Sequence, residues 1–326
     1  MKAVIWTNYG APDGLILRDV EKPTPKHNQV LIKIQASSVT AGDCEMRRLK
    51  FPLWLAIPLR LYVGIRKPKR IQILGQEFSG VVEAVGQDVT RFKPGDEIFG
   101  TTGFGFGAYA EYICVPENPA DAEGVIITKP SNMTFEEAAV ASTGGLEALY
   151  FLQKAKLEKG QKILINGAGG SIGTFAIQLA KHWGAEVTAV DHTDKLEMLR
   201  SIGADHVVDY TKETFTHTDK KYDVVFDIIG KGSFSGVAKL LNPKGRYLLG
   251  NTQLLKLLRG MFLINKRLIG GTSPQRKEDL IFLRELIEIG ALKSVIDRTY
   301  SLAEMATAHE YVESGRKKGN LVIKTC

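Results

Sequence analysis

The stretch from residue 163 to residue 191 constrains the fold of this chain more than any other part of its sequence. It reads ILINGAGGSIGTFAIQLAKHWGAEVTAVD. An apolar, β-rich run, Ile163–Ile165, leads through a glycine turn into a helix of small and apolar residues, and a second β-rich run, Glu186–Val190, ends at Asp191. A strand–turn–helix–strand unit of about 30 residues is the size of a βαβ nucleotide-binding half. The sequence predicts such a unit here.

The spacing of the glycines in this turn differs from the common G-x-G-x-x-G fingerprint, which would need a glycine where Ile172 stands. A G-x-x-G-x-x-G pattern fits instead. Glycines let the backbone approach a pyrophosphate, which then lies at the positive end of the helix dipole. The alternative is a βα turn that binds nothing. We predict that the turn binds a dinucleotide through Gly167, Ala168, Gly170, Ser171, Ile172 and Gly173.

The composition is that of a globular chain with room for two domains. The 326 residues are 44% hydrophobic and 24% charged, both ordinary values. The beginning of the chain has no apolar signal-peptide pattern. Its three cysteines, Cys44, Cys114 and Cys326, form no C-x-x-C motif, which favours reduced thiols. No apolar run is long enough to span a membrane. We therefore expect a cytoplasmic protein that is not integrated in a membrane.

The net charge of +7 is dispersed apart from two basic clusters, residues 66–70 and 316–318. Basic clusters can contact nucleic acids or acidic membranes. The simpler interpretation is that both are solvated loops, and we expect no nucleic-acid partner.

The pattern of secondary structure changes near Pro116. Before it, β-rich runs alternate with Gly/Pro turns, which indicates a β-barrel-like domain. After it comes an expected helix over 135–156, then alternating strands and helices typical of a doubly wound parallel sheet. The mixed tail is expected to rejoin the first domain. The predicted fold class is α/β, with domains at 1–117 plus 272–326 and at 118–271.

Several motifs in one order make the chain resemble the medium-chain dehydrogenase/reductase superfamily, in its zinc-free quinone oxidoreductase-like branch, which is alcohol dehydrogenase-like in fold. They are residues 74–86 (LGQEFSGVVEAVG), 92–100 (FKPGDEIFG), 107–112 (GAYAEY), the glycine turn and 199–210 (LRSIGADHVVDY). The resemblance implies a GroES-like catalytic domain, a Rossmann domain, an active site in the cleft between them, and a homodimer.

The residues at the zinc positions of this superfamily differ here. Thr40 stands where the zinc branch has a Cys, and Gln76 where it has a His. Catalytic zinc needs three such ligands and an open position. Cys44 lies off the expected position and is expected to be a buried or half-buried thiol. We predict no metal.

Without a Lewis acid, the expected reaction is transfer of a hydride from a reduced nicotinamide to a quinone or an α,β-unsaturated carbonyl. The cofactor supplies the hydride, and the protein orients the reactants. Thr40 and Asp43 match positions that line the family's cleft, which makes them the candidate catalytic residues. Both residue types are also preferred at helix N-termini, where they would simply cap a helix.

The apolar stretch 51–70 has two interpretations. It is either a lid that offers Trp54 and Tyr62 to a hydrophobic substrate, or core or dimer contact. Residues 254–263 are equally ambiguous between an interface helix and a pocket wall.

The choice of cofactor depends on the end of the second strand. An acid there binds the adenine ribose and repels a 2′-phosphate, so Asp191 favours NAD(H). The resemblance implies NADP(H) instead, because Lys195 and Tyr210 match its basic and aromatic positions, and His192 adds a donor. Surface and capping roles for Lys195 and Asp191 are the alternatives. We favour NADP(H), with NAD(H) possible.

Further cofactor contacts are expected from the ends of later strands, following the crevice rule for open α/β sheets. These candidates are Asp227, Gly250 and Asn251. Together the features predict an NAD(P)H-dependent quinone or enone reductase. The alternatives are an alcohol/ketone dehydrogenase and a dinucleotide-binding sensor with little turnover.

Overall fold

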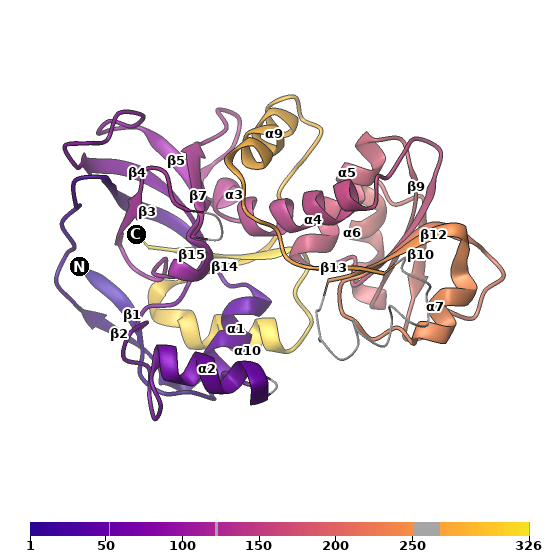
Figure 1. Cartoon of the computed structure of the whole chain (residues 1–326), viewed down its shortest axis with the longest axis horizontal. Helices are drawn as coiled ribbons and strands as arrows, with labels where there is room; N and C mark the ends of the chain where they lie inside the picture. The colour runs from indigo at the N-terminus through magenta and orange to yellow at the C-terminus, as the bar shows by residue number, and fades with distance from the viewer. Residues whose placement is uncertain (52, 121–122, 251–267, 326) are drawn as a thin grey trace. The chain divides into compact units, whose positions relative to one another are not determined.

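A computed structural model describes residues 1–51, 53–120, 123–250 and 268–325, with only the backbone described for Leu53 and Trp54. Contacts divide the chain into two units (Figure 1). Unit 1 comprises residues 1–143, 275–288 and 296–326, and unit 2 comprises residues 144–274 and 289–295.

Unit 1 is built on a seven-stranded, mainly antiparallel sheet with the order β14-β15-β3-β4-β5-β7, in which β6 also pairs with β3. A separate pair, β1 with β2, lies beside it. The strands are β1 (Lys2–Trp6), β2 (Leu15–Asp19), β3 (Gln29–Ser38), β4 (Glu77–Val85), β5 (Glu97–Thr101), β6 (Tyr112–Pro116), β7 (Val125–Thr128), β14 (Ile296–Ser301) and β15 (Asn320–Lys324). The tail strand β15 joins β3, so the end of the chain does rejoin this unit.

Helices flank this sheet: α1 (Ala41–Arg48), α2 (Leu53–Val63), α3 (Phe135–Ala139), α9 (Lys277–Glu288) and α10 (Met305–Glu313). α3 packs on β3 and β4, and α1 packs against α10 (Figure 1). The first 115 residues therefore contain more helix than the β-barrel interpretation allowed. The sequence pattern did not predict α2. This helix is apolar on all sides and carries Pro58 in its interior, so it lacks the 3.6-residue periodicity that indicates a helix.

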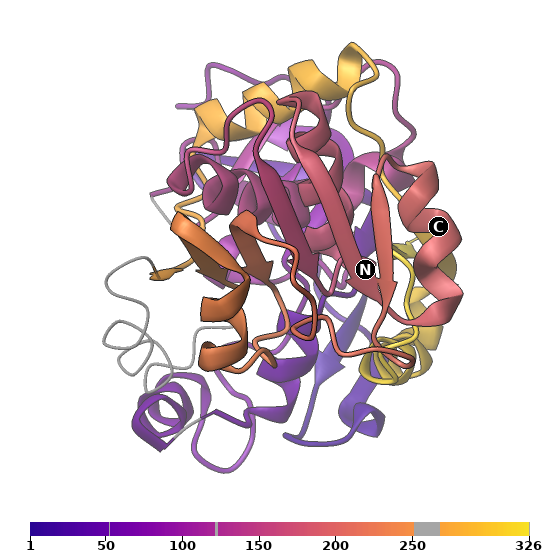
Figure 2. The same ribbon diagram turned by 90° about the vertical axis from the view of Figure 1, so that its right-hand side faces the viewer.

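Unit 2 is a six-stranded parallel sheet with the order β10-β9-β8-β11-β12-β13, shown in Figure 2. The strands are β8 (Lys162–Asn166), β9 (Glu186–Asp191), β10 (His206–Asp209), β11 (Tyr222–Asp227), β12 (Leu241–Leu249) and β13 (Leu268–Gly270). This is the 3-2-1-4-5-6 order of dinucleotide-binding sheets. The helices are α4 (Ser142–Lys154, which begins in unit 1), α5 (Ser171–His182), α6 (Leu196–Ser201) and α7 (Phe234–Leu240).

The helix expected over 135–156 is two helices, α3 and α4. A capping box between Thr134 and Glu137 starts α3, which ends at Ala139. α4 begins at Ser142, whose hydroxyl donates to the Gly100 carbonyl at 3.0 Å. This bond fixes the start of α4 to a strand about forty residues away, and helical periodicity does not reveal it.

The two units differ from the predicted division at residues 118–143, which lie in unit 1, and at residues 272–274, which lie in unit 2. β7 pairs with β5 and α3 packs on β3 and β4, so this segment extends the first sheet. Residues 289–295 lie in unit 2, where the Lys293 N–H donates to the Gln178 side chain at 2.8 Å.

Candidate functional site

The glycine turn lies where the strand order of the parallel sheet reverses. β8 and β11 are neighbours in the sheet although two other strands separate them in sequence. Ligands of open α/β sheets bind at such a switch point, beyond the carboxyl ends of the strands. Here Asn166 ends β8 and Asp227 ends β11, and the Asn166 amide donates to Asp227 Oδ1 at 2.8 Å.

Two glycines of the predicted triplet are required by close backbone packing. Gly167 has φ +83°, and a Cβ there would lie 2.6 Å from the Ile229 side chain. A Cβ on Gly173 would lie 2.4 Å from the Ala168 carbonyl oxygen, so α5 packs against the turn that precedes it. Any larger residue at Gly173 collides with backbone.

The middle glycine faces open space. Gly170 is the N-cap of the twelve-residue helix α5 and supplies no side-chain cap. A Cβ on Gly170 would meet nothing closer than the Gly167 oxygen at 3.7 Å. The helix start therefore presents backbone N–H groups and its positive dipole end beside the glycines of the turn, which is the chemistry that suits a pyrophosphate. The turn fits a dinucleotide.

Both oxygens of the Asp191 carboxylate accept hydrogen bonds from the protein backbone, one of them from the same turn. The carboxylate accepts from the Gly169 N–H at 2.7 Å and the His192 N–H at 2.8 Å. The Lys195 ammonium lies 3.2 Å from Asp191 Oδ1, and both side chains are buried. The acid and the base that favour different cofactors in sequence are thus partners in one ion pair.

Gly169 belongs to this arrangement, and sequence reasoning missed it. A Cβ there would lie 2.5 Å from Lys195 Cδ and 2.9 Å from Asp191 Oδ2. Its signal in the sequence is the doubled glycine at 169–170, which the triplet pattern leaves unexplained.

His192 and Tyr210 lie beside the ion pair, at the ends of β9 and β10. Their rings meet edge to face with centroids 6.0 Å apart, and the Tyr210 N–H donates to the Asp191 carbonyl at 3.2 Å. Tyr210 is half exposed. Burial, then the nearby carboxylates of Asp191 and Asp209, raise the pKa of its hydroxyl. The structure therefore brings together Asp191, His192, Lys195 and Tyr210.

Asp227 is buried and organises the next loop. It accepts from the N–H groups of Gly230 and Gly232 at 2.9 and 2.8 Å and from the Tyr247 hydroxyl at 3.0 Å. Its backbone carbonyl accepts from the Gly250 N–H at 3.0 Å. Asp227 and Gly250 thus shape the carboxyl end of the sheet. Asn251, like the stretch 254–263, lies outside the described residues.

Thr40 and Asp43 form a capping box at the start of α1. The Thr40 hydroxyl donates to Asp43 Oδ2 at 2.7 Å, and the Asp43 N–H donates to Thr40 Oγ1 at 3.1 Å. The capping interpretation therefore holds for both residues. A Cβ built on Gly42 would lie within 3.5 Å of both Thr40 Oγ1 and Gln76 Oε1, so the two positions that the resemblance matches to zinc ligands lie close together.

A buried polar chain continues from Asp43 through unit 1. His309 Nε2 lies 3.2 Å from the Tyr109 hydroxyl, and His309 Nδ1 lies 3.3 Å from Cys44 Sγ. Burial raises the pKa of Cys44 to about 12 and lowers the pKa of His309 to about 3. Both are therefore neutral near pH 7, and the expected buried thiol is confirmed. Sequence reasoning missed Tyr109 and His309 because they are 200 residues apart.

The surroundings of Asp43 disfavour the ionised form of its carboxyl group. Burial raises its pKa to about 6, against the lowering effect of the Thr40 and Tyr109 contacts. Oδ2 accepts the two bonds from Thr40, whereas Oδ1 is buried without a hydrogen bond in the described structure.

Glu77 is a second buried carboxylate of unit 1. It accepts from the Ser38 hydroxyl, from the Ser142 hydroxyl at 3.2 Å and from the Thr143 N–H at 2.8 Å. Burial raises its pKa.

Within the described ranges, no group of three or more His, Cys, Asp or Glu side chains is arranged to hold a metal ion. No helix there has the length and apolar character to cross a membrane.

The predicted substrate contacts lie on α2. Tyr62 is half exposed, and the Arg70 guanidinium lies 4.1 Å from the centre of its ring. The side chain of Trp54 lies outside the described residues. The inner face of α2, with Leu59 and Val63, packs in a core cluster of unit 1. Core packing thus accounts for one face of this stretch.

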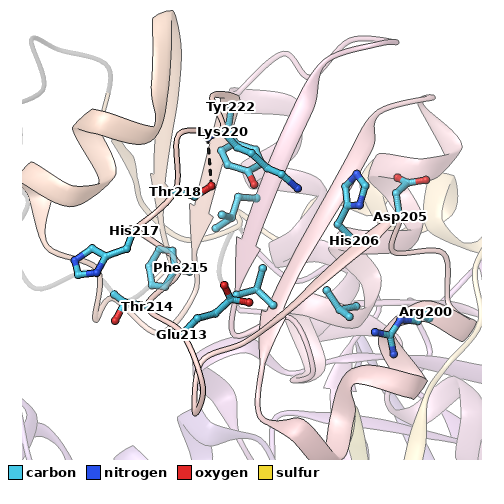
Figure 3. A pocket seen from close by; sticks show the side chains of 13 residues that line it. Arg200, Asp205, His206, Glu213, Thr214, Phe215, His217, Thr218, Lys220 and Tyr222 are labelled. Atoms are coloured by element: carbon cyan, nitrogen blue, oxygen red, sulfur yellow. Dashed lines mark hydrogen bonds between the residues drawn. The ribbon is translucent and has the colours of Figure 1, made fainter.

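A pocket of about 380 Å³ lies elsewhere in unit 2 (Figure 3). It is formed by the starts of β10 and β11 and the loop between them, with polar residues such as Arg200, Glu213 and His217 around it. None of the predicted cofactor residues lines it, so it is distinct from the glycine turn.

Comparison with known proteins supports one family for the whole chain. Residues 26–121 match a family model described as an alcohol dehydrogenase GroES-like domain, and residues 202–323 match one described as a zinc-binding dehydrogenase. Together with the parallel sheet, these matches confirm the predicted fold class.

Named relatives cover the chain almost completely. It is 34% identical over 343 residues to 2-methylene-furan-3-one reductase of Solanum lycopersicum, and 32% identical over 344 residues to the chloroplastic NADPH-dependent alkenal/one oxidoreductase of Arabidopsis thaliana. Each alignment covers 99% of this chain and 79% of the relative. The solved quinone oxidoreductase of Coxiella burnetii is 30% identical with a TM-score of 0.88, covering 100% of this chain and 99% of that one.

Substitutions at two neighbouring glycines are expected to separate folding from binding. Gly173→Ala places a methyl group against the Ala168 backbone and should lower the free energy of unfolding by at least about 2 kcal/mol. Gly170→Ala meets open space and should cost about 1 kcal/mol or less, yet weaken dinucleotide binding. Denaturant unfolding and calorimetric titration with NADPH and NADH test both. Unaltered binding by folded Gly170→Ala protein would contradict the assignment of the turn.

Asp43→Asn is expected to change the pH dependence of stability. Because the folded-state pKa is raised from 3.8 to about 6, the folded carboxyl binds more protons than the unfolded one, and stability falls as pH rises through this range. The shift corresponds to about 3 kcal/mol. Asn keeps an acceptor oxygen but cannot ionise, so the variant should gain stability relative to wild type between about pH 4 and pH 7.

Denaturant unfolding of both proteins across this range measures the difference. The neutral, buried His309 has the opposite pH dependence, but it is present in both proteins. A stability difference that stays constant with pH would show that Asp43 does not titrate as the structure indicates.

Proposed function

This chain belongs to the quinone oxidoreductase-like branch of the medium-chain dehydrogenase/reductase superfamily, and we propose that it is an NAD(P)H-dependent reductase of quinones and α,β-unsaturated carbonyls. The observation that carries the proposal is the glycine-lined start of α5 at the switch point of the parallel sheet. Similarity over the full length to enone and quinone reductases supports the substrate class.

The chemistry needs little from the protein besides binding and orientation. When bound, the reduced nicotinamide supplies the hydride. Quinones and enones are already electrophilic, so a polar contact to the carbonyl oxygen is enough to stabilise the charge that develops there. In this proposal the Thr40 hydroxyl, which donates to Asp43 Oδ2 at 2.7 Å here, turns to donate to that oxygen instead. Asp43 is a positioning residue, because its carboxylate still accepts from the Thr40 N–H at 2.9 Å and holds Thr40 in place.

A turnover panel tests this function. NADPH and NADH are crossed with quinones, alkenals, simple ketones and alcohols, and zinc content is measured. We expect consumption of reduced nicotinamide with quinones or alkenals, no stoichiometric zinc, and no effect of chelators. Thr40→Val should lower kcat by about ten- to a hundredfold, whereas Thr40→Ser should retain most of it because the hydroxyl remains.

Other outcomes of the panel would overturn the proposal. Chelator-sensitive alcohol oxidation with bound zinc would favour a metal-dependent dehydrogenase, the alternative to which the zinc-binding description of the match over residues 202–323 points. Absence of turnover with every acceptor, together with tight dinucleotide binding, would favour a sensor protein.

We propose NADPH as the preferred cofactor. The Asp191 carboxylate is neutralised by Lys195 and bound to the Gly169 N–H, so its repulsion of a 2′-phosphate is reduced. Lys195, His192 and Tyr210 lie together at the same edge and offer a cation and hydrogen-bond donors to that phosphate. The name of the Arabidopsis relative supports this choice.

Two variants test the cofactor choice. Lys195→Met should lower kcat/KM for NADPH by about tenfold or more, with a smaller effect on NADH, because it removes a cation near a phosphate. Asp191→Asn keeps an acceptor for the Gly169 N–H, so it should raise the NADPH-to-NADH ratio without opening the turn. The double variant controls for the charge that either single change leaves buried. If the NADPH-to-NADH ratio of kcat/KM is unchanged in Lys195→Met, Lys195 does not contact the phosphate.

The assembly and compartment complete the proposal. Family precedent supports a homodimer, which sedimentation measures. The scattered cysteines support a reducing, cytoplasmic environment.

A further inference from the structure

Almost all of the chain's net charge comes from one segment. Eight of the 43 Lys and Arg residues lie between positions 46 and 76, which contain none of the 36 Asp and Glu residues. Outside this segment, basic and acidic residues nearly balance. The net charge of +7 is therefore a local property of α2 and its flanks.

Two of these eight residues form ion pairs, and they share one carboxylate. Arg47 and Arg48 both pair with Glu313 of α10. The other six form no ion pair with any acidic residue that the structure describes. They are exposed, and five of them lie in the last turn of α2 or in the loop that follows it: Arg60, Arg66, Lys67, Lys69 and Arg70.

An apolar ridge lies on the outer face of the same helix. Ile57 and Leu61 are four residues apart on α2 and are 56% and 68% exposed, and Ile65, which is 65% exposed, follows just after the end of the helix. Residues four apart lie on one face of a helix. The opposite face, with Leu59 and Val63, packs in the core. A helix that is apolar all round normally has both faces covered, so the outer face of α2 lacks a cover in the described structure.

The basic loop is held against the end of this helix. The N–H groups of Lys69 and Arg70 both donate to the Val63 carbonyl, at 2.9 and 3.0 Å. Arg60 donates to the Ile65 carbonyl at 3.1 Å. Arg70 lies over the ring of Tyr62. The backbone of the basic loop is therefore held beside the apolar ridge.

We propose that this surface, formed by Ile57, Leu61, Tyr62 and Ile65 with the five basic residues, docks on an anionic lipid bilayer. The apolar side chains enter the interface, and the Lys and Arg side chains contact the lipid head groups. The helix lies in the interface and does not cross the membrane. This binding does not depend on the proposed catalytic function.

The charges favour a lipid over the other occupants of an apolar face. A second copy bound symmetrically through the same patch would bring two sets of like charges together. Nucleic acid would use the basic side chains but would leave the apolar ridge exposed to water. An anionic bilayer satisfies both parts of the surface.

Vesicle flotation with the full chain tests the proposal. Wild-type protein should bind vesicles containing about one third phosphatidylglycerol at about 0.1 M salt, bind pure phosphatidylcholine at least about tenfold more weakly, and dissociate progressively as salt rises. Each basic residue near an anionic surface contributes roughly fivefold. The triple variant Arg66→Gln, Lys67→Gln, Lys69→Gln should therefore lose roughly a hundredfold in binding.

Matched variants separate the two parts of the surface from a general charge effect. Lys26→Gln, Lys33→Gln, Lys93→Gln removes the same charge from exposed positions of unit 1 and should bind like wild type. Ile57→Ser with Leu61→Ser removes the apolar contacts at exposed positions and should weaken binding about tenfold or more. Circular dichroism checks that each variant is folded.

Three results would overturn the proposal. They are no binding of wild type to anionic vesicles, equal binding to phosphatidylcholine, and equal loss in both triple variants. Sedimentation supplies a further test: if the serine variants dissociate a dimer while lipid binding is absent, the face joins two copies of the chain.

Discussion

The buried carboxylate of Asp191 is the interaction on which the dinucleotide turn depends. It joins three parts of unit 2: the turn after β8, through the Gly169 N–H, the end of β9, through the His192 N–H, and the start of α6, through Lys195. A buried acid is stable only when its charge is paired and its oxygens are hydrogen-bonded, and Asp191 meets both conditions. The turn is therefore shaped before any ligand arrives, which reduces the ordering cost of binding.

This arrangement changes how the end of the second strand determines cofactor choice. An acid there discriminates against a 2′-phosphate only if its charge is felt at the phosphate. In this chain the Lys195 ammonium lies 3.2 Å from that charge, so the pair has little net field. Specificity then depends on how Lys195 divides its interactions between Asp191 and a phosphate, and on the half-exposed Tyr210 and the His192 ring beside it.

Local patterns in the sequence predicted the elements but not the partners of their side chains. The strands on both sides of the glycine turn, and β11 at Tyr222–Asp227, lie where the β-rich runs placed them, because buried parallel strands are continuous apolar runs. Asp191 and Lys195 are only four residues apart and form an ion pair, yet in the sequence they favoured different cofactors. The Gly169 contact spans 22 residues, and no periodicity encodes such a bond.

Unit 1 shows the same limit for its polar interior. Thr40 and Asp43 are separated by one helical turn, so their capping role was foreseeable. The chain from Asp43 to Tyr109, His309 and Cys44 comes from three separate segments. It is assembled by the return of the tail to the first sheet, and only the topology brings α10 against α1.

Unlike these buried groups, the apolar residues on the outer face of α2 are not explained by the stability of the fold. Stability requires only that Leu59 and Val63 be covered, and they are. Polar residues could replace Ile57 and Leu61 without loss of core packing, since single exposed apolar residues contribute little to the free energy of folding. The proposed docking surface accounts for their position beside Ile65 and next to a run of basic residues with no acidic neighbour in sequence. A surface that is both apolar and positively charged has its physical complement at the boundary of an anionic bilayer.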